Sequence, residues 1–186
     1  MGYQPRSLYK IIEDINRSLF LPHIQRPFVW SREQMQRLFD SLMRSYPIQT
    51  MLFWRTKDEI KARKFMPLLE WDADLHLLYD DAMSKAAVEK AFVLDGQQRI
   101  QTLYTLFAGN VHAGEKKAPE EAYVDVTSGT TVDPSGLLYH LEFSATPLPL
   151  PRVHLELWYA VPPTKGGHQH GNFTVCRHPN SLHRGA

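Results

Sequence analysis

The chain has 186 residues, of which 43% are hydrophobic and 22% charged, and its formal net charge is +1 at pH 7. This length allows one domain with a sizeable core, and the near-neutral charge gives no global indication of nucleic-acid binding. No apolar run approaches the roughly 20 residues of a membrane span, and the first residues lack the apolar region of a signal peptide. Because Cys176 is the single cysteine, no internal disulfide can form, and we expect a cytoplasmic protein without a membrane partner.

Residues 7–19 form the first predicted helix. Their apolar positions recur with the spacing of one helical face: Leu8, Ile11, Ile12, Ile15 and Leu19. The segment from Leu21 to Trp30 predicts a rigid loop instead, since Pro27 lacks an N–H donor and restricts Arg26 to an extended backbone.

A second predicted helix covers residues 32–45. Ser31 is a suitable N-cap, and Gln34 stands where a capping box requires its partner. The helix has one strongly apolar face, made by Met35, Leu38, Phe39, Leu42 and Met43. A strand is expected over residues 50–54.

The middle of the chain contains a charged segment and then a pattern typical of a strand, a turn and a helix. Residues 57–64 predict a solvated segment, residues 75–79 favour a strand, and residues 82–90 favour a helical link. The apolar residues 92–94 predict a short strand, and after an Asp-Gly turn the apolar period predicts a helix over 97–108.

Residues 123–126 and 137–143 predict two strands joined as a hairpin, because turn-forming residues separate them. The whole pattern predicts an α+β fold, in which the three amphipathic helices pack against a small mixed sheet. Three apolar stripes require a common apolar surface.

The composition changes near Pro147, so we expect a domain over residues 5–146 and an irregular or aberrant tail over 147–186. Residues 151–186 hold five of the nine histidines, and no apolar period persists in them beyond Tyr159. We expect residues 160–186 to be poorly ordered. A shifted reading frame is one alternative, and another is a zinc site with ligands that match no common module: His168, His170, Cys176 and His178.

The turn at Asp95-Gly96 carries the most specific chemistry in the sequence. A glycine between a strand and a helix lets backbone approach a ligand, and the first N–H groups of a helix favour an anion. Arg99 adds a planar guanidinium suited to phosphate. The alternative is an ordinary strand–helix turn in which polar residues cap the helix. No Walker-type loop, His-Glu-x-x-His motif or serine nucleophile elbow is present in the sequence.

Several segments together resemble the N-terminal domain of the GmrSD family of modification-dependent restriction endonucleases. The resemblance covers roughly residues 5 to 145. It rests on residues 25–30 (Gln-Arg-Pro-Phe-Val-Trp), 38–42 (Leu-Phe-Asp-Ser-Leu), 46–48 (Tyr-Pro-Ile), 95–99 (Asp-Gly-Gln-Gln-Arg) and 102–103 (Thr-Leu). It implies a fold similar to ParB and sulfiredoxin, in which the corresponding loops bind a nucleoside triphosphate, with or without Mg²⁺.

The resemblance also suggests site residues. Four residues are expected to bind the nucleotide: Gln25, Arg26, Ser41 and Gly96. Four are expected to take part in catalysis: Asp95, Gln97, Gln98 and Arg99.

Their individual roles leave alternatives open. Arg26 and Arg99 are expected to contact phosphate, the alternative being surface ion pairs. Gln97 and Gln98 would hold a phosphate oxygen, a base edge or an attacking water. Asp95 would coordinate Mg²⁺ or cap the helix that follows it, and its place next to a glycine in a turn favours capping. The aromatic residues Phe28 and Trp30 favour a place in the core over base stacking.

The implied function is nucleotide binding, with hydrolysis as the expected next step, in a modification-dependent DNA restriction or phage-defence system. The implied partners are a nucleoside triphosphate, DNA and a nuclease domain or subunit. Members of the family are usually far longer, and many carry an HNH-type nuclease domain downstream, a pattern from which this chain departs. We therefore expect DNA cleavage to depend on a separate domain. The alternative is a binding-only module or an inactive truncated remnant.

Overall fold

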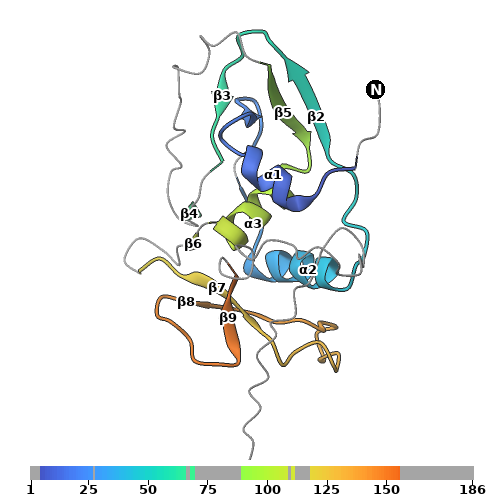
Figure 1. Ribbon diagram of the computed structural model, residues 1–186, viewed down its shortest axis with the longest axis vertical. Helices are drawn as coiled ribbons and strands as arrows, with labels where there is room; N and C mark the ends of the chain where they lie inside the picture. Colours follow the sequence, from blue (N-terminus) through green and yellow to red (C-terminus); the bar gives the residue numbers. More distant parts are fainter. Residues whose placement is uncertain are drawn as a thin grey trace, which may run out of the picture.

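The computed structural model describes residues 5–26, 28–65, 68–69, 89–108, 110–111 and 118–155 (Figure 1). Its helices are α1 (Leu8–Asp14), α2 (Arg32–Met43) and α3 (Gln97–Ala108). Its strands are β1 (Leu19–Pro22), β2 (Leu52–Thr56), β3 (Ala62–Arg63), β4 (Leu68–Leu69), β5 (Lys90–Asp95), β6 (Asn110–Val111), β7 (Glu121–Asp125), β8 (Leu141–Ser144) and β9 (Arg152–His154).

The larger sheet is mixed and has the strand order β2-β5-β1-β3. Its central pair, β1 and β5, is parallel, and the outer strands β2 and β3 run antiparallel to their neighbours. A second sheet, β8-β7-β9, is antiparallel, and β4 pairs with β6 in parallel. In Figure 1 the three helices lie between the larger sheet at the top and the antiparallel sheet at the bottom. The α+β prediction with a mixed sheet is confirmed.

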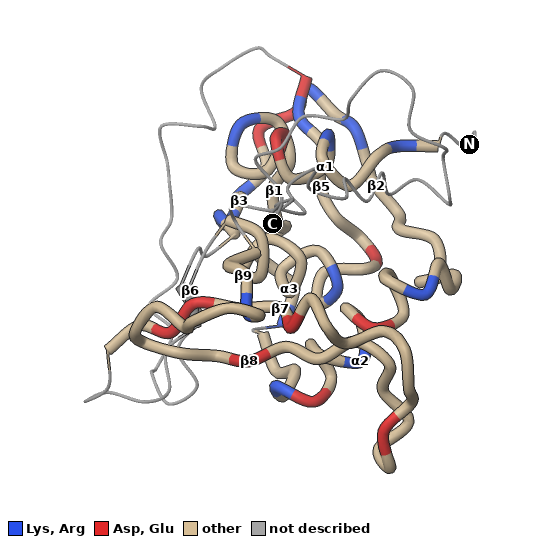
Figure 2. The backbone as a smooth tube through the Cα atoms, turned by 60° about the horizontal axis from the view of Figure 1, so that its bottom comes forward, with Lys and Arg blue, Asp and Glu red and all other residues tan. Residues whose placement is uncertain are grey.

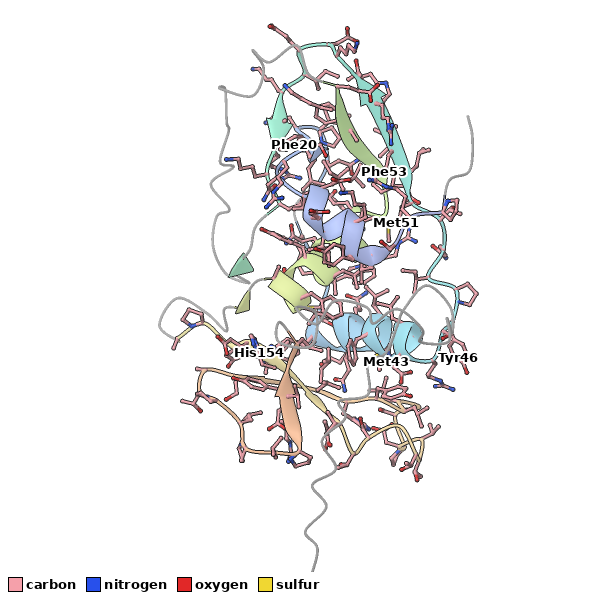
Figure 3. The ribbon with its side chains drawn as sticks, in the orientation of Figure 1. Phe20, Met43, Tyr46, Met51, Phe53 and His154 are labelled. Carbon is pink, nitrogen blue, oxygen red and sulfur yellow. The ribbon has the colours of Figure 1, made fainter. Side chains whose placement is uncertain are left out.

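Two apolar clusters hold these layers together. The first joins the larger sheet to α1 and α3 through buried residues such as Val93, Leu19 and Ile100. The second joins all three helices to the antiparallel sheet, with Ile12, Phe39 and other residues from each helix. The predicted common core of the three helices is therefore confirmed, but helix α2, which was expected against the mixed sheet, packs instead with the other helices on the antiparallel sheet. Met51, labelled in Figure 3, packs against both clusters.

Helix α3 is the centre of the molecule. Ten of its twelve residues are buried, among them polar residues at Gln97, Gln98 and Arg99. A helix that is buried on several sides must satisfy its polar side chains within the protein, because an unpaired buried polar group costs about 1–3 kcal/mol. The bonds that satisfy them connect α3 to two loops and define the candidate site.

The helix predictions are confirmed for α2 and α3. Ser31 and Gln34 form the expected capping box of α2. The first helix is shorter than predicted, since α1 ends at Asp14 and Asn16 adopts a left-handed conformation with φ of 58°. Leu19 therefore begins a strand and does not continue the helix. The predicted strand at residues 75–79 and residues 82–88 of the predicted helical link lie outside the described residues, and the last residue of that link, Lys90, begins strand β5 instead of ending a helix.

The predicted hairpin is confirmed as β7 and β8, with Tyr123 opposite Glu142. Strand β9 pairs with the other edge of β7, so a strand lies beyond the expected boundary at residue 146. Residues 156–186, which contain the expected disordered segment and the candidate zinc ligands, lie outside the described residues. Among the helices that the structure describes, none has the length and hydropathy needed to cross a membrane.

Candidate functional site

The two segments singled out by the sequence lie directly against each other. We call them the Gln25 loop (residues 23–26 and 28–30) and the Gly96 turn (residues 94–98). Three hydrogen bonds join them: Gln25 Nε2 to the Leu94 carbonyl oxygen (3.2 Å), Gln97 Nε2 to the Arg26 carbonyl oxygen (2.7 Å) and Val29 N–H to Gln98 Oε1 (2.9 Å). About 70 sequence positions separate the partners, so the fold brings two distant segments into direct contact.

Gly96 gives the turn a backbone that other residues rarely adopt. Its φ is +90°, and a Cβ placed on it would lie 2.9 Å from Met51 Cγ. Its carbonyl oxygen accepts the N–H of Ile100, which begins the hydrogen-bonding of α3. The glycine is therefore required for conformation and for close packing, and it brings the chain abruptly from β5 into α3.

Arg99 is a buried residue with a relative exposure of 9%. Its guanidinium donates to the carbonyl oxygen of Ile48, in the connection between α2 and β2, and to Asp95 Oδ2 at 3.2 Å. The predicted phosphate contact of Arg99 stays a prediction. The structure shows that this guanidinium links the Gly96 turn to the α2–β2 connection.

Arg63 was expected in a solvated charged segment, and that expectation is wrong. It lies on β3 opposite Leu21 of β1, and its relative exposure is 8%. Its Nη2 donates to the carbonyl oxygens of Gln25 (2.9 Å) and Arg26 (3.2 Å). Burial is possible because main-chain oxygens, which the sequence pattern does not reveal, solvate the charge.

Two charged side chains of the site face solvent. Arg26 is exposed, and the described residues provide no hydrogen bond or ion pair to its guanidinium. Asp95 has a side-chain exposure of 69% and accepts a bond from Arg99. Arg26 follows Gln25 in the chain and Asp95 follows Leu94. Each charged residue is therefore next to one partner of the Gln25–Leu94 hydrogen bond. Positive and negative residues are interspersed over the other described elements (Figure 2).

The other predicted residues are less closely connected to this contact. Ser41 lies on α2, where its hydroxyl donates to the carbonyl oxygen of Arg37 one turn earlier, at 2.8 Å. The described structure shows no bond from Ser41 to either loop. Phe28 and Trp30 are partly buried against the core, which confirms their structural interpretation.

Asp40 lies in the last turn of α2, and the sequence analysis did not predict that it would bind another segment of the chain. Its relative exposure is 4%, and its Oδ1 accepts the N–H groups of Leu138 and Tyr139 at 2.9 Å each. Arg44 donates to its Oδ2 at 3.3 Å, and the same guanidinium lies 4.5 Å from the ring centre of Tyr46, which is labelled in Figure 3. These contacts fix the connection between β7 and β8 to α2.

The described residues contain no group of three or more histidine, cysteine or acidic side chains arranged to hold a metal ion. Mg²⁺ bound together with a nucleotide needs less from the protein, since one or two carboxylates and the substrate phosphates often suffice. Asp95 is the carboxylate of the site that fits this requirement, because it is exposed next to the turn.

Comparison with protein families gives the chain its relatives. The family model described as "GmrSD restriction endonuclease, N-terminal domain" matches residues 8–148, which include all three helices and the strands from β1 to β8. A search of curated proteins gives no match. Because the matched region spans most of the chain and contains both site segments, the chain belongs to the GmrSD restriction endonuclease N-terminal domain family, and this membership associates it with DNA restriction.

Proposed function

We propose that the chain binds a nucleoside triphosphate together with Mg²⁺ where the Gln25 loop meets the Gly96 turn. The observation that carries this proposal is the exposed pair of charges, Arg26 and Asp95, each of which directly follows a partner of the Gln25–Leu94 hydrogen bond in the chain. An exposed guanidinium is suited to phosphate oxygens, and a nearby carboxylate is suited to the accompanying metal ion.

The start of α3 supports the same proposal. The helix is twelve residues long, and its first N–H groups carry partial positive charge that favours an anion. The positive φ of Gly96 turns the backbone sharply from β5 into this end of the helix. Together with Arg26, these groups would offset the charge of a triphosphate.

We propose hydrolysis as the second step, with Asp95 holding Mg²⁺ and Arg26 stabilising the charge that develops on the transferred phosphoryl group. Gln97 and Gln98 donate to or accept from the Gln25 loop, so their expected catalytic role would be to hold that loop in place as well as to contact the substrate. Binding without hydrolysis is the alternative within the proposal.

In the restriction system, nucleotide binding or hydrolysis would license a nuclease domain or subunit that cleaves modified DNA. This coupling and the ParB/sulfiredoxin-like character of the fold rest on the family resemblance, whereas the proposed cytoplasmic location rests on the single cysteine. The family match supports the association with restriction and extends over both site segments.

A calorimetric titration with ATP and GTP, each with excess Mg²⁺, tests the proposal. Arg26→Ala should weaken binding about tenfold or more, because a charge-assisted contact contributes about 1.5–3 kcal/mol. Arg37→Ala is the matched control, since Arg37 is exposed on α2 and its guanidinium has no bond to the site among the described residues. Phosphate release by the same samples separates hydrolysis from binding. Equal affinity of wild type and Arg26→Ala would exclude this site.

A further inference from the structure

We propose that Arg63 is a positioning residue of the candidate nucleotide site, which acts by holding the main chain of Gln25 and Arg26. The inference rests on the proposed function for its consequence, although the contacts themselves belong to the described structure. In this proposal the buried guanidinium of Arg63 on β3 orients the loop that carries the exposed guanidinium of Arg26.

The position of Arg63 is fixed by the larger sheet. Its Cα pairs with Leu21 in the antiparallel β1–β3 ladder, and Leu21 is 3% exposed in the core. The N–H of His23 also donates to the carbonyl oxygen of Lys61, at 3.2 Å. Backbone pairing therefore holds β3, which carries Arg63, beside the segment that leads from β1 into the Gln25 loop.

From this position the guanidinium reaches two successive carbonyl oxygens. The distances from Nη2 are 2.9 Å to Gln25 and 3.2 Å to Arg26, and Gln97 Nε2 donates to the second oxygen at 2.7 Å. The carbonyl oxygen of Arg26 is thus held by a cation from β3 and by an amide from α3. Charge-assisted bonds of this kind are roughly twice as strong as neutral ones.

Holding that carbonyl fixes the peptide plane that follows it and restricts how the Arg26 side chain can leave the backbone. Arg26 itself is exposed and its guanidinium has no partner among the described residues, so its orientation depends on the loop that carries it. Arg63 therefore lowers the conformational entropy that Arg26 loses when it binds a triphosphate.

Arginine is specifically suited to this role. A planar guanidinium can direct two N–H groups from one nitrogen towards neighbouring oxygens, whereas lysine presents a single ammonium on a flexible stem. Arg63→Lys should keep part of the effect and Arg63→Met should remove it. Arg55 is the matched control, because it is an arginine on the edge strand β2 with an exposed ion pair to Glu89 at 3.8 Å.

A double-mutant cycle tests the proposal. Mg²⁺–ATP and Mg²⁺–GTP affinities are measured for wild type, Arg26→Ala, Arg63→Met and the double variant, after thermal unfolding has shown that each is folded at the working temperature. Arg63→Met should weaken binding about fivefold in the wild-type background and less than about twofold in the Arg26→Ala background. Arg63→Lys should lie between wild type and Arg63→Met, and Arg55→Met should match wild type. Equal effects of Arg63→Met in both backgrounds, or no effect in either, would overturn the proposal.

Amide hydrogen exchange on the protein without ligand tests the positioning role separately from nucleotide binding. Arg63→Lys and Arg63→Met should increase exchange at Val29, whose N–H closes the Gln25 loop onto Gln98, while exchange at Phe39 in α2 stays unchanged. If wild type binds neither nucleotide, the proposed function fails, and Val29 exchange still decides the positioning role. Unchanged Val29 exchange in both variants would overturn the proposal even if nucleotide binds. If Arg63→Met does not fold, Arg63→Lys alone supplies both measurements.

Discussion

The side chain of Gln97 donates to the main-chain oxygen of Arg26 at 2.7 Å, across 71 positions of sequence. A side-chain amide that the motif suggests for the substrate therefore holds the protein's own backbone. The first turn of α3 and the Gln25 loop consequently form one structural unit, and a substitution in either segment should alter the structure of both.

Gln97→Leu should lower the free energy of unfolding by about 1 kcal/mol, because it removes one hydrogen bond and keeps a similar volume. Arg63 still donates to the same oxygen, which limits the loss. Chemical denaturation measures the change. Gln36→Leu on α2 is the control, since no side-chain bond of Gln36 is found among the described residues, and equal losses for the two variants would argue against the importance of the Gln97 bond.

Gly96→Ala should be more damaging than Gly136→Ala. Both glycines have a positive φ, +90° and +86°, so both substitutions introduce a similar conformational penalty of about 1–2 kcal/mol. Only at Gly96 would the new methyl group collide with Met51, at 2.9 Å from Cγ, whereas nothing lies within 4 Å at Gly136. Denaturant unfolding should show at least about 1 kcal/mol of additional loss for Gly96→Ala. Equal losses would mean that Met51 moves aside freely.

Asp40→Ala should destabilise the protein by about 1.5–3 kcal/mol, since it deprives the N–H groups of Leu138 and Tyr139 of a buried charged acceptor. Asp40→Asn should cost less, because its amide oxygen can still accept from both. Amide exchange at Leu138 and Tyr139 should rise in step with the stability loss. Glu59→Ala, an exposed acidic residue, serves as the control, and a similar effect there would contradict the anchoring role.

The pKa of the Tyr123 phenol is raised, first by burial and then by its hydrogen bond to Glu121 and the negative charge of that residue. Since the pKa is higher in the folded protein, the stability that this group contributes is fully present below its unfolded pKa of about 10 and is lost as the pH rises through the folded value. Glu121→Gln should bring the pKa back towards its ordinary value.

Ultraviolet absorbance of tyrosinate, with Tyr123→Phe subtracted, follows this single phenol. Glu142→Gln is the control, because Glu142 lies opposite Tyr123 in the sheet and forms an exposed ion pair with Arg152. The titration midpoint should fall in Glu121→Gln and stay closer to wild type in Glu142→Gln. An unchanged midpoint in Glu121→Gln would show that Glu121 does not contribute.

Local signals in the sequence predicted the elements that are determined locally. The capping box at Ser31 and Gln34 places the start of α2, and the Gly96 turn places the start of α3. The helical spacing from Ile15 to Leu19 was misleading, since Asn16 turns the chain and Leu19 joins β5 in a parallel pair that only the folded sheet creates.

Interactions between distant segments could not be predicted in the same way. Arg63 stands among charged residues and has every local feature of a solvated side chain, yet it is buried against the carbonyl oxygens of a loop 37 and 38 positions away. Arg99 likewise reaches Ile48 across 51 positions. Main-chain acceptors have no sequence signature, so the anchors of the site become visible only in three dimensions.

The central claim is that a nucleoside triphosphate binds where the Gln25 loop meets the Gly96 turn, and backbone amide resonances test it most directly. On titration with Mg²⁺–ATP or Mg²⁺–GTP, the largest shifts should fall on Arg26, Gly96 and Gln97, and Arg26→Ala should move the saturation point to about tenfold higher concentration. The amides of Tyr123 and Val124 in the antiparallel sheet should change little. Saturable shifts confined to other elements, or no shifts with either nucleotide, would contradict the account.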